Sequence, residues 1–557
     1  MSRSIRQQWI THDLKRTTGD AARQANIDAG RAVATALRST LGPSGRDKML
    51  VGTNGTVIVT NDGASILDRM DIEDPAAQMV AQAANEQKEI IGDGATTTVL
   101  LVGELLSKAE DLLNDGLHPT VILKGYYRAA SHTLQRLDKY RADCTLEDNE
   151  LLQAVAKTAV TGRWGAEATN LFSTLTTDAV HAAGRNSKPG TSSITTKAFP
   201  GGELRDSELI DGILVDMDAS STTIEMLETS TPSTLTNARL ALVDAEIDIG
   251  PPDNIDQVTI STPEQLDSLQ EYESDTKNKI TQTLANLDVD ILFCQKSIDD
   301  AIRTRLAKEG ILAAERTRQD EFDALARATA ATAVQSISDL DRTNIGIAGL
   351  VEQRSAGSAH LLIIAGLSGD KQVSLLLRGG TKHVAEETKR IIESCTAVVQ
   401  GTVQGGGILP GGGATETALS MDLSKYANTI SGREQLAIRA FSSSLESIPR
   451  ALINNAGRDP SELLPRLRNR HVDNPMVGVD SSTGKLRDML EADILEPTVV
   501  KRHCLTTALE TAATILRIDD ILQHTGTDSG DVTTSDSRRS QGHTSQSTSG
   551  YPWAIGH

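Results

Sequence analysis

The chain has 557 residues and a formal net charge of −20, and aromatic residues make up only 3% of it. This length exceeds what one hydrophobic core usually supports, so we expect about two to four domains with cores of Ala, Val, Leu and Ile. The acidic balance excludes binding to nucleic acid and to anionic membranes, because both would repel the chain.

Arg outnumbers Lys, and Asp and Thr are abundant, which suits a cytoplasm rich in salt; an ordinary acidic surface is the alternative. The four cysteines, at positions 144, 294, 395 and 504, show no Cys-x-x-Cys spacing, which indicates a reducing compartment. No apolar signal segment follows Met1, and no apolar run approaches the ~20 residues that span a bilayer. These features predict a cytoplasmic protein.

The first 140 residues carry the patterns of several helices and one hairpin. Apolar residues at helical spacing, from Ile27 to Leu37, predict a helix over 20–37. Two strand-like runs, 48–51 and 56–60, flank a strong Asn-Gly turn signal and predict a β-hairpin. Helices are expected next at about 75–90, 96–114 and 119–140, the last with a proline in its first turn.

The middle of the chain has a different pattern. Signals are mixed from 150 to 215, and from 216 to 370 strand-like runs (241–245, 289–293, 361–365) alternate with helical runs (264–286, 298–308, 318–330). This alternation predicts an inserted α/β domain. Residues 371–403 are again mixed and 404–522 are mainly helical, so we expect the two ends of the chain to share one domain.

The run IGDGATTT, from Ile91 to Thr98, is the most informative motif. Gly92 and Gly94 allow a tight turn, and Asp93 is a hard oxygen ligand of the kind that Mg²⁺ prefers. The threonines begin a helix, and the free N–H groups and positive dipole end of a helix N-terminus favour phosphate. The motif therefore predicts a site for Mg²⁺ and phosphate; a glycine turn with threonine caps before a core helix is the alternative.

Other short motifs accompany this one in a fixed order. Glycine-rich loops lie at 41–50, 61–63 and 408–416. Further runs are DPAAQ at 74–78, GELL at 103–106, HPT at 118–120, FCQK at 293–296, LLRGGT at 376–381, SGREQLA at 431–437, EP at 496–497 and RIDD at 517–520. Together they resemble the group II chaperonins, the archaeal thermosome and its eukaryotic cytosolic relatives, over roughly residues 10–522.

The resemblance implies a multidomain fold that combines helical, α+β and α/β parts. A mainly helical equatorial ATP-binding domain would comprise 1–150 and 404–524. A small mixed intermediate domain would comprise 151–218 and 370–403. An α/β apical substrate-binding domain would comprise 219–369, with an acidic helical protrusion, the family's lid, at about 245–282. Residues 525–557 form a Ser/Thr/Gly-rich tail that has too few apolar residues to fold.

The resemblance also implies a function and its partners. The family's ATP-dependent subunits enclose unfolded polypeptides in a double ring, so other chaperonin subunits and unfolded clients are expected as partners, in a homo- or hetero-oligomer. The family's hairpin, here 48–60, reaches the neighbouring subunit. ATP or ADP and Mg²⁺ are the implied cofactors, with K⁺ as a further candidate.

The family's site residues can be assigned by position. Asp93 matches the Mg²⁺ ligand, and Asp62 matches a carboxylate close to the attacking water. The positions expected to surround the nucleotide are Leu41, Gly42, Pro43, Asp93, Gly94, Ala95, Thr96, Thr97, Gly162, Arg163, Gly412, Gly478 and Glu496.

Three positions depart from the family pattern. Ala95 replaces the first threonine of the usual GDGTTT, and Arg163 replaces a lysine with a planar guanidinium. Ser394 stands where the family has the aspartate that activates water; a shift of one residue would place Glu393 there instead. A serine hydroxyl is no base at neutral pH without help, and general-base assistance contributes about 10²–10⁴-fold. We therefore predict ATP binding with slow hydrolysis.

Three functions follow from these patterns. One is an active chaperonin subunit, and the second is a regulatory subunit that binds ATP and hydrolyses it weakly in a mixed ring. The third is a stand-alone protein that binds nucleotides or small anions, against which the hairpin and the inserted domain argue. Residues 478–485, GVDSSTGK, resemble a Walker A loop, but the spacing has one residue too many and Leu486 replaces the required Ser or Thr.

Overall fold

The computed structural model describes residues 14–52, 55, 57–184, 193–217, 234–249, 263–357 and 359–524. Contacts divide the chain into two compact units, residues 23–518 and the two terminal segments 1–22 and 519–557. In the terminal unit, β1 (Leu14–Thr18) pairs antiparallel with β18 (Asp520–His524). This pairing brings the two ends of the described chain together.

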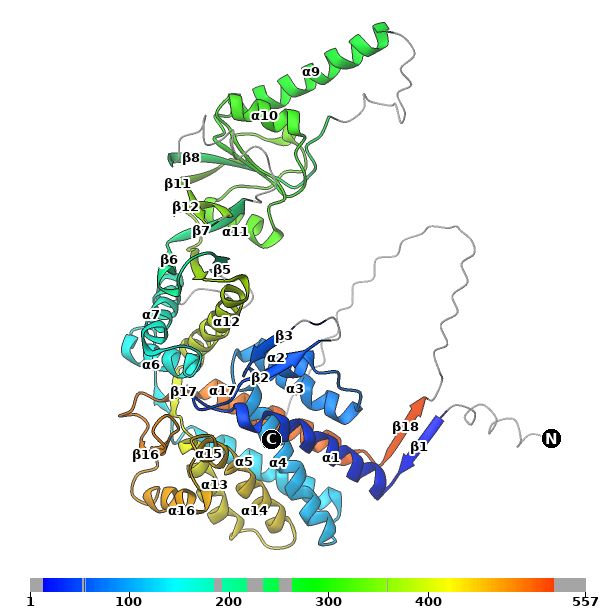
Figure 1. Cartoon of the computed structure of the whole chain (residues 1–557), viewed down its shortest axis with the longest axis vertical. Coiled ribbons are helices and arrows are strands. Elements are labelled where there is room, and N and C mark those ends of the chain that lie inside the picture. Colours follow the sequence, from blue (N-terminus) through cyan, green and yellow to red (C-terminus); the bar gives the residue numbers. More distant parts are fainter. Residues whose placement is uncertain are drawn as a thin grey trace, which may run out of the picture. The chain divides into compact units, whose positions relative to one another are not determined.

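One region of the larger unit is mainly helical and combines early and late segments of the chain (Figure 1). Its early helices are α1 (Asp20–Leu37), α2 (Gly63–Arg69), α3 (Pro75–Ile91), α4 (Ala95–Asn114) and α5 (Pro119–Leu137). Its late helices are α13 (Ala414–Ala427), α14 (Glu434–Leu445), α15 (Ser447–Asn455), α16 (Pro460–Arg470) and α17 (Thr498–Arg517).

Small sheets complete this helical region. The hairpin β2–β3 pairs Lys48–Val51 with Val57–Thr60, and the hairpin β15–β16 pairs Val477–Asp480 with Lys485–Asp488. A three-stranded sheet has the order β17 (Leu495–Pro497), β14 (Gly407–Pro410) and β4 (Ala142–Asp143).

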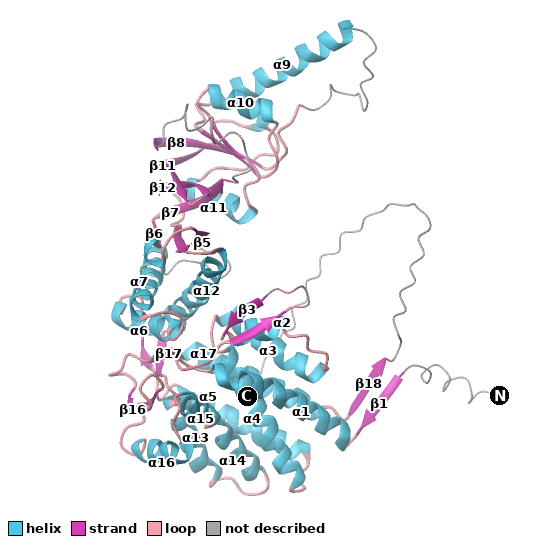
Figure 2. Cartoon of the chain, in the orientation of Figure 1, coloured by secondary structure: helices cyan, strands magenta, loops and turns pink. Residues whose placement is uncertain are grey.

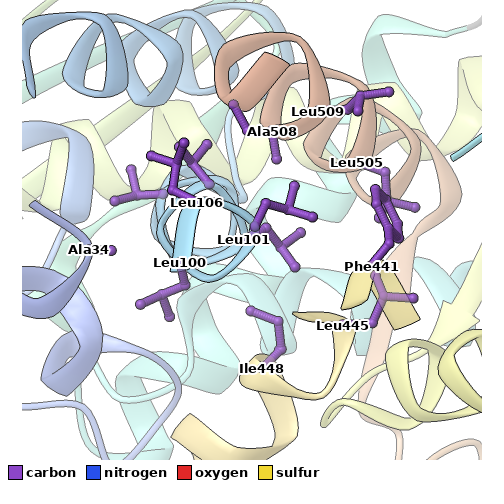
Figure 3. Packing of buried hydrophobic residues seen from close by; sticks show 14 of the residues in the cluster. Ala34, Leu100, Leu101, Leu106, Phe441, Leu445, Ile448, Leu505, Ala508 and Leu509 are labelled. Atoms are coloured by element: carbon purple, nitrogen blue, oxygen red, sulfur yellow. The ribbon is translucent and has the colours of Figure 1, made fainter. Parts of the chain in front are cut away.

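Helix α4 lies at the centre of the largest hydrophobic core (Figure 3). Leu100, Leu101 and Leu106 are almost completely buried, and α4 packs against helices from both ends of the chain, α1, α14 and α17 among them. A helix that is apolar on nearly every side must be enclosed in this way. The packing fixes the N-terminus of α4, which is where IGDGATTT lies.

A second region contains long helices and a three-stranded sheet. Its elements are α6 (Asn149–Val160), α7 (Ala166–Ala183), α12 (Lys382–Gly405), and the strands β5 (Ile194–Pro200), β13 (Val373–Gly379) and β6 (Glu208–Ile210), in that order in the sheet. Buried apolar residues of α6, α7 and α12 form one core with β13.

A third region is an α/β arrangement around a six-stranded sheet (Figure 2). The sheet order is β10 (Leu312–Ala314), β9 (Ile291–Cys294), β8 (Thr234–Val243), β11 (Gly346–Ala356), β12 (Ala359–Leu367) and β7 (Gly212–Met217). The helices are α9 (Pro263–Asn286), α10 (Asp300–Lys308) and α11 (Gln319–Thr329).

Successive side chains of β8 alternate between the two faces of the sheet, which explains why helices cover both faces. Leu240 and Leu242 belong to the core that includes residues of α11, whereas Ala241 and Val243 belong to the core that includes residues of α9 and α10. Successive strand residues point to opposite faces, so both faces of the sheet are covered by helices.

The expected elements are present, with small shifts at their ends. Helix α5 ends at Leu137 rather than 140, and α10 begins at Asp300 rather than 298 because the Asp299 side chain caps it, accepting from the N–H of Ala301 and Ile302. Residues 477–488 form a hairpin, not the strand, loop and helix of a Walker A site. Residues 250–262 of the expected lid and the tail 525–557 lie outside the described residues. None of the described helices is long and apolar enough to cross a bilayer.

Candidate functional site

A cavity of about 570 Å³ lies where several glycine turns meet α6 and α17. All the predicted site residues line it except Gly162, Gly478 and Ser394. A second hollow, of about 700 Å³, lies over α16 and the β15–β16 hairpin, and it contains none of the predicted residues. The smaller cavity is therefore the candidate functional site.

Asp93 lies in the turn between α3 and α4, where two glycines fix its place. Gly92 ends α3 at φ 88° and Gly94 caps α4 at φ 90°, a backbone conformation that L side chains rarely adopt. A Cβ on Gly94 would come within 2.5 Å of the Cys504 Sγ, so the turn packs closely against α17. The Asp93 side chain is exposed to the cavity beside the N-terminus of α4, and its Oδ1 accepts from the Gly94 N–H at 2.6 Å.

The electrostatic surroundings of Asp93 suit a bound cation. Desolvation raises the pKa of its carboxyl, and the Gly94 hydrogen bond and the charges of Lys501 and Arg163 only partly oppose this. Among the described residues, no three His, Cys, Asp or Glu side chains converge on a metal site. One carboxylate together with substrate phosphates is a usual way to hold Mg²⁺, and Asp93 fits that arrangement.

Gly162 and Gly478 lie next to residues that line the cavity, and both are closely packed against other backbone segments. Gly162 has φ 84°, and a Cβ there would lie 2.9 Å from the carbonyl oxygen of Pro43. A Cβ on Gly478 would lie 2.8 Å from the carbonyl oxygen of Gly411 and 3.0 Å from that of Gly412. Both positions thus allow two backbone segments to approach closely, and neither lines the cavity itself.

A cluster of charges that is largely buried lies at the cavity wall, where Lys501 and Glu496 line the cavity. Lys501 donates to Glu416 at 2.5 Å and also to Glu496, and the Lys501 and Glu416 side chains are 5% and 4% exposed. Burial alone would lower the pKa of Lys501, but the two carboxylates raise it well above its ordinary value. Burial raises the pKa of Glu496. Glu416 contributes only its Oε1 to a hydrogen bond within the described structure.

Asp62 and Lys88 form a second ion pair at another part of the cavity wall. The Asp62 side chain caps α2, accepting from the Ser65 N–H at 2.9 Å, and it accepts from the Lys88 Nζ as well. Burial would raise the pKa of Asp62, but the charge of Lys88 and hydrogen bonds from Lys88 and Ser65 lower it overall. Asp62 therefore stays a carboxylate at neutral pH.

Ser394, rather than Glu393, lies near Asp62 and Asp93. Ser394 lines a small adjoining cavity of about 40 Å³ together with Asp62, Asp93 and Arg163. Glu393 does not line that cavity; it faces an outer groove, and its nearest basic partner is Lys389 at 3.7 Å. Of these two residues, Ser394 is therefore the one that shares the small cavity with Asp62, and it also lines the outer groove.

The cations of the site that the sequence patterns did not identify include Lys88 and Lys501. Lys88 precedes the glycine turn by one helical turn, and Lys501 lies in the first turn of α17 after the Glu496-Pro497 pair. Asp62 is 26 residues from Lys88, and the buried partner of Lys501, Glu416, is 85 residues away. A lysine among the apolar residues of a helix can indicate a buried ion pair. This pattern alone does not identify the partner, so it did not lead to a prediction.

All four cysteines are buried and carry free thiols. Burial raises the pKa of Cys395 and of Cys504 to about 12. The Cys504 Sγ lies 3.4 Å from the carbonyl oxygen of Gly94, so this thiol packs directly against the turn that carries Asp93.

The chain matches the TCP-1/cpn60 chaperonin family over residues 33–525. It is 39% identical over 514 residues to thermosome subunit alpha of Halobacterium salinarum and 40% identical over 514 residues to thermosome subunit 1 of Haloferax volcanii, in both cases over 92% of this chain and 90% of the relative. It is 38% identical over 522 residues to thermosome subunit beta of Archaeoglobus fulgidus, over 93% of this chain and 94% of the relative.

Fold and cavity together thus define a multidomain protein with a cavity lined by glycine turns and acidic residues at a helix N-terminus. The chain belongs to the TCP-1/cpn60 chaperonin family.

Proposed function

We propose that the chain is an ATP-dependent chaperonin subunit that helps unfolded proteins to fold within a double ring. The observation that carries the proposal is Asp93, held between two left-handed glycines at the N-terminus of α4 and open to the cavity. A helix N-terminus with a carboxylate ligand beside it suits the phosphates of a nucleotide and their Mg²⁺.

The cavity allows the nucleotide to be oriented. The phosphates would lie at the α4 N-terminus, with Thr96, Thr97 and Arg163 among the groups that face them. The base and ribose would lie toward Glu496 and Gly412. Bound Mg²⁺ would supply charge neutralisation for phosphoryl transfer. Asp62, kept anionic, would accept a hydrogen bond from the attacking water and orient it.

We propose slow hydrolysis because Ser394 offers no carboxylate where the family has an aspartate. The regulatory or structural subunit of a mixed ring is the second candidate function, and Ser394 favours it. In that case the chain would bind ATP, and partner subunits would supply most of the turnover.

The β2–β3 hairpin supports assembly with other subunits. Met49, Val51, Val57 and Val59 are all more than half exposed, and an isolated two-stranded ribbon is marginally stable in water. Pairing with a neighbouring subunit would cover these side chains. The relatives include both alpha and beta thermosome subunits of one organism, which is compatible with a mixed ring.

The domain assignment remains part of this proposal. The helical region corresponds to the equatorial domain (1–150, 404–524), the second region to the intermediate domain (151–218, 370–403) and the six-stranded sheet to the apical domain (219–369). Strand β7 joins the six-stranded sheet from just before the proposed boundary at 218.

Steady-state phosphate release with Mg²⁺-ATP at molar KCl, measured for the wild type and Ser394→Asp, tests the proposal. We expect a low rate for the wild type and an increase of about tenfold or more on restoring the carboxylate. A wild type that already turns over rapidly, with little change in Ser394→Asp, would contradict slow hydrolysis. A chain that does not bind ATP, or that is monomeric by size determination, would contradict the chaperonin role.

A further inference from the structure

Two hydrogen bonds of defined geometry reach the Asp62 side chain, and both end on the same carboxylate oxygen. The Lys88 Nζ and the Ser65 N–H both reach Oδ2 of Asp62. Among the described hydrogen bonds none ends on the other oxygen, Oδ1, so Oδ1 can accept from a further donor such as water. Two donors on Oδ2, one of them charged, restrain the position of that oxygen.

Lys88 connects the beginning of α2 to the end of α3. Its Nζ also lies 3.2 Å from the Ser65 Oγ, so one ammonium binds both the side chain that caps α2 and a hydroxyl in the first turn of that helix. Lys88 and Asp62 are 26% and 23% exposed, which leaves the pair partly desolvated. Lys88 lines the main cavity and the small cavity beside it.

Lys88 differs from the other two cations that line the small cavity. Arg390 pairs with Glu387 at 2.9 Å, and Arg163 lines the cavity without an ion pair to Asp62 among the described contacts. Within the described structure, Lys88 is the cation in salt-bridge contact with Asp62.

We propose that Lys88 is a positioning residue for hydrolysis: it holds Asp62 through Oδ2 and so presents Oδ1 to the attacking water. The inference rests on the proposed ATP hydrolysis at this site. It matters in this chain because Ser394 brings no second carboxylate, which leaves Asp62 as the carboxylate that can orient the water. Lys88 acts through Asp62 and not through contact with the phosphates.

A double-mutant cycle tests this route of action. Wild type, Lys88→Met, Asp62→Asn and the double variant are compared by single-turnover cleavage of radiolabelled Mg²⁺-ATP with the assembled protein in excess, and ATP and ADP affinities are measured by calorimetry. Lys88→Met keeps the aliphatic stem and removes the charge. Lys108→Met serves as the matched control because Lys108 pairs with Asp111 on α4 and does not line the cavity.

We expect Lys88→Met to slow cleavage about tenfold with ATP affinity changed less than about twofold, and to have no further effect in the Asp62→Asn background. Lys88→Arg should restore part of the rate, since a guanidinium can also hold the carboxylate. Lys108→Met should match the wild type.

Other results would overturn the inference. An additive loss in the double variant, or a selective loss of ATP over ADP affinity, would mean that Lys88 contacts the phosphates itself. An unchanged rate in Lys88→Met, or a wild type that binds ATP without any cleavage above buffer, would also overturn it. A wild type that binds no ATP would instead contradict the proposed function, so the two failures are distinct.

Discussion

The two ion clusters of the cavity differ in burial and in charge balance. In the first cluster, Lys501 and Glu416 are 5% and 4% exposed, and Lys501 also pairs with Glu496, which is 23% exposed. In the second cluster, Lys88 and Asp62 form a single ion pair, and about a quarter of each side chain is exposed. A buried charge is costly to leave unpaired, whereas a partly solvated pair contributes little to stability. We therefore expect loss of one partner to cost more stability in the Lys501 cluster than in the Asp62–Lys88 pair.

The departures from the family pattern agree with this division. Arg163 and Ser394 both line the small cavity beside Asp62, and Ala95 lies in the turn region of Asp93. None of them contacts the Lys501 cluster through a described ion pair. Changes in turnover should therefore be separable from changes in stability, and the following experiments test that separation.

The largest effect is expected for Lys501→Met. This substitution leaves the buried Glu416 without a counter-charge and also removes the partner of the partly exposed Glu496, which should destabilise the helical region by about 3–5 kcal/mol. Thermal and urea denaturation of the variant should show the loss, and Lys485→Met on the exposed strand β16 is the control. Equal stability of the two variants would contradict the expectation that the Lys501 cluster contributes more to stability than an exposed lysine does.

Asp93→Asn should weaken Mg²⁺-ATP binding by about 100-fold while the melting temperature stays within a few degrees of the wild type. The amide keeps the shape of the side chain but loses the charge that would hold the cation. Calorimetric titration with and without Mg²⁺ measures the effect. If binding without Mg²⁺ falls by the same factor, Asp93 does not hold the metal.

The Asp62–Lys88 pair should contribute less than about 1 kcal/mol to stability, with a defined pH dependence. The pKa of Asp62 is lowered from 3.8 in the folded chain, so the stabilisation is fully present above that value and is lost as pH falls through the lower, folded value. The stability difference between wild type and Asp62→Asn should be constant from pH 8 to about pH 5 and shrink only below about pH 4. A difference that changes between pH 8 and pH 6 would point to another group.

The smallest effect is expected for Glu393→Gln. Because Glu393 faces the outer groove and not Asp62, phosphate release should change less than about twofold. A loss of tenfold or more would show that Glu393 moves toward the water and that Ser394 was assigned the wrong role.

Local patterns predicted most of the fold and much of the site, and the reason lies in particular residues. Gly92 and Gly94 impose the turn at Asp93 by backbone geometry alone, so three letters of sequence suffice to place a carboxylate at the α4 N-terminus. Helix ends were less certain: a single cap, Asp299, moved the beginning of α10 by two residues.

The lysines that pair with Asp62 and Glu416 could not be predicted in the same way. Lys501 meets Glu416 only because α17 and α13 pack around α4, and Lys88 meets Asp62 only because α3 lies against α2. These contacts depend on tertiary packing between segments, for which sequence periodicity carries no distance information. The sequence therefore identified the backbone turns of the site but not the counter-ions of its carboxylates.

Two buried thiols beside the cavity can report local opening of the helices around them. Cys395 on α12 and Cys504 on α17 have pKa values of about 12, so almost no thiolate exists at neutral pH while the helices stay packed. Alkylating reagents then react mainly when a local opening of the packing exposes a thiol: Cys395 packs against the Ala156 carbonyl of α6, and Cys504 against the Gly94 carbonyl. The labelling rate of each thiol therefore measures how often the packing around that thiol opens. The measurement needs no probe on the protein surface.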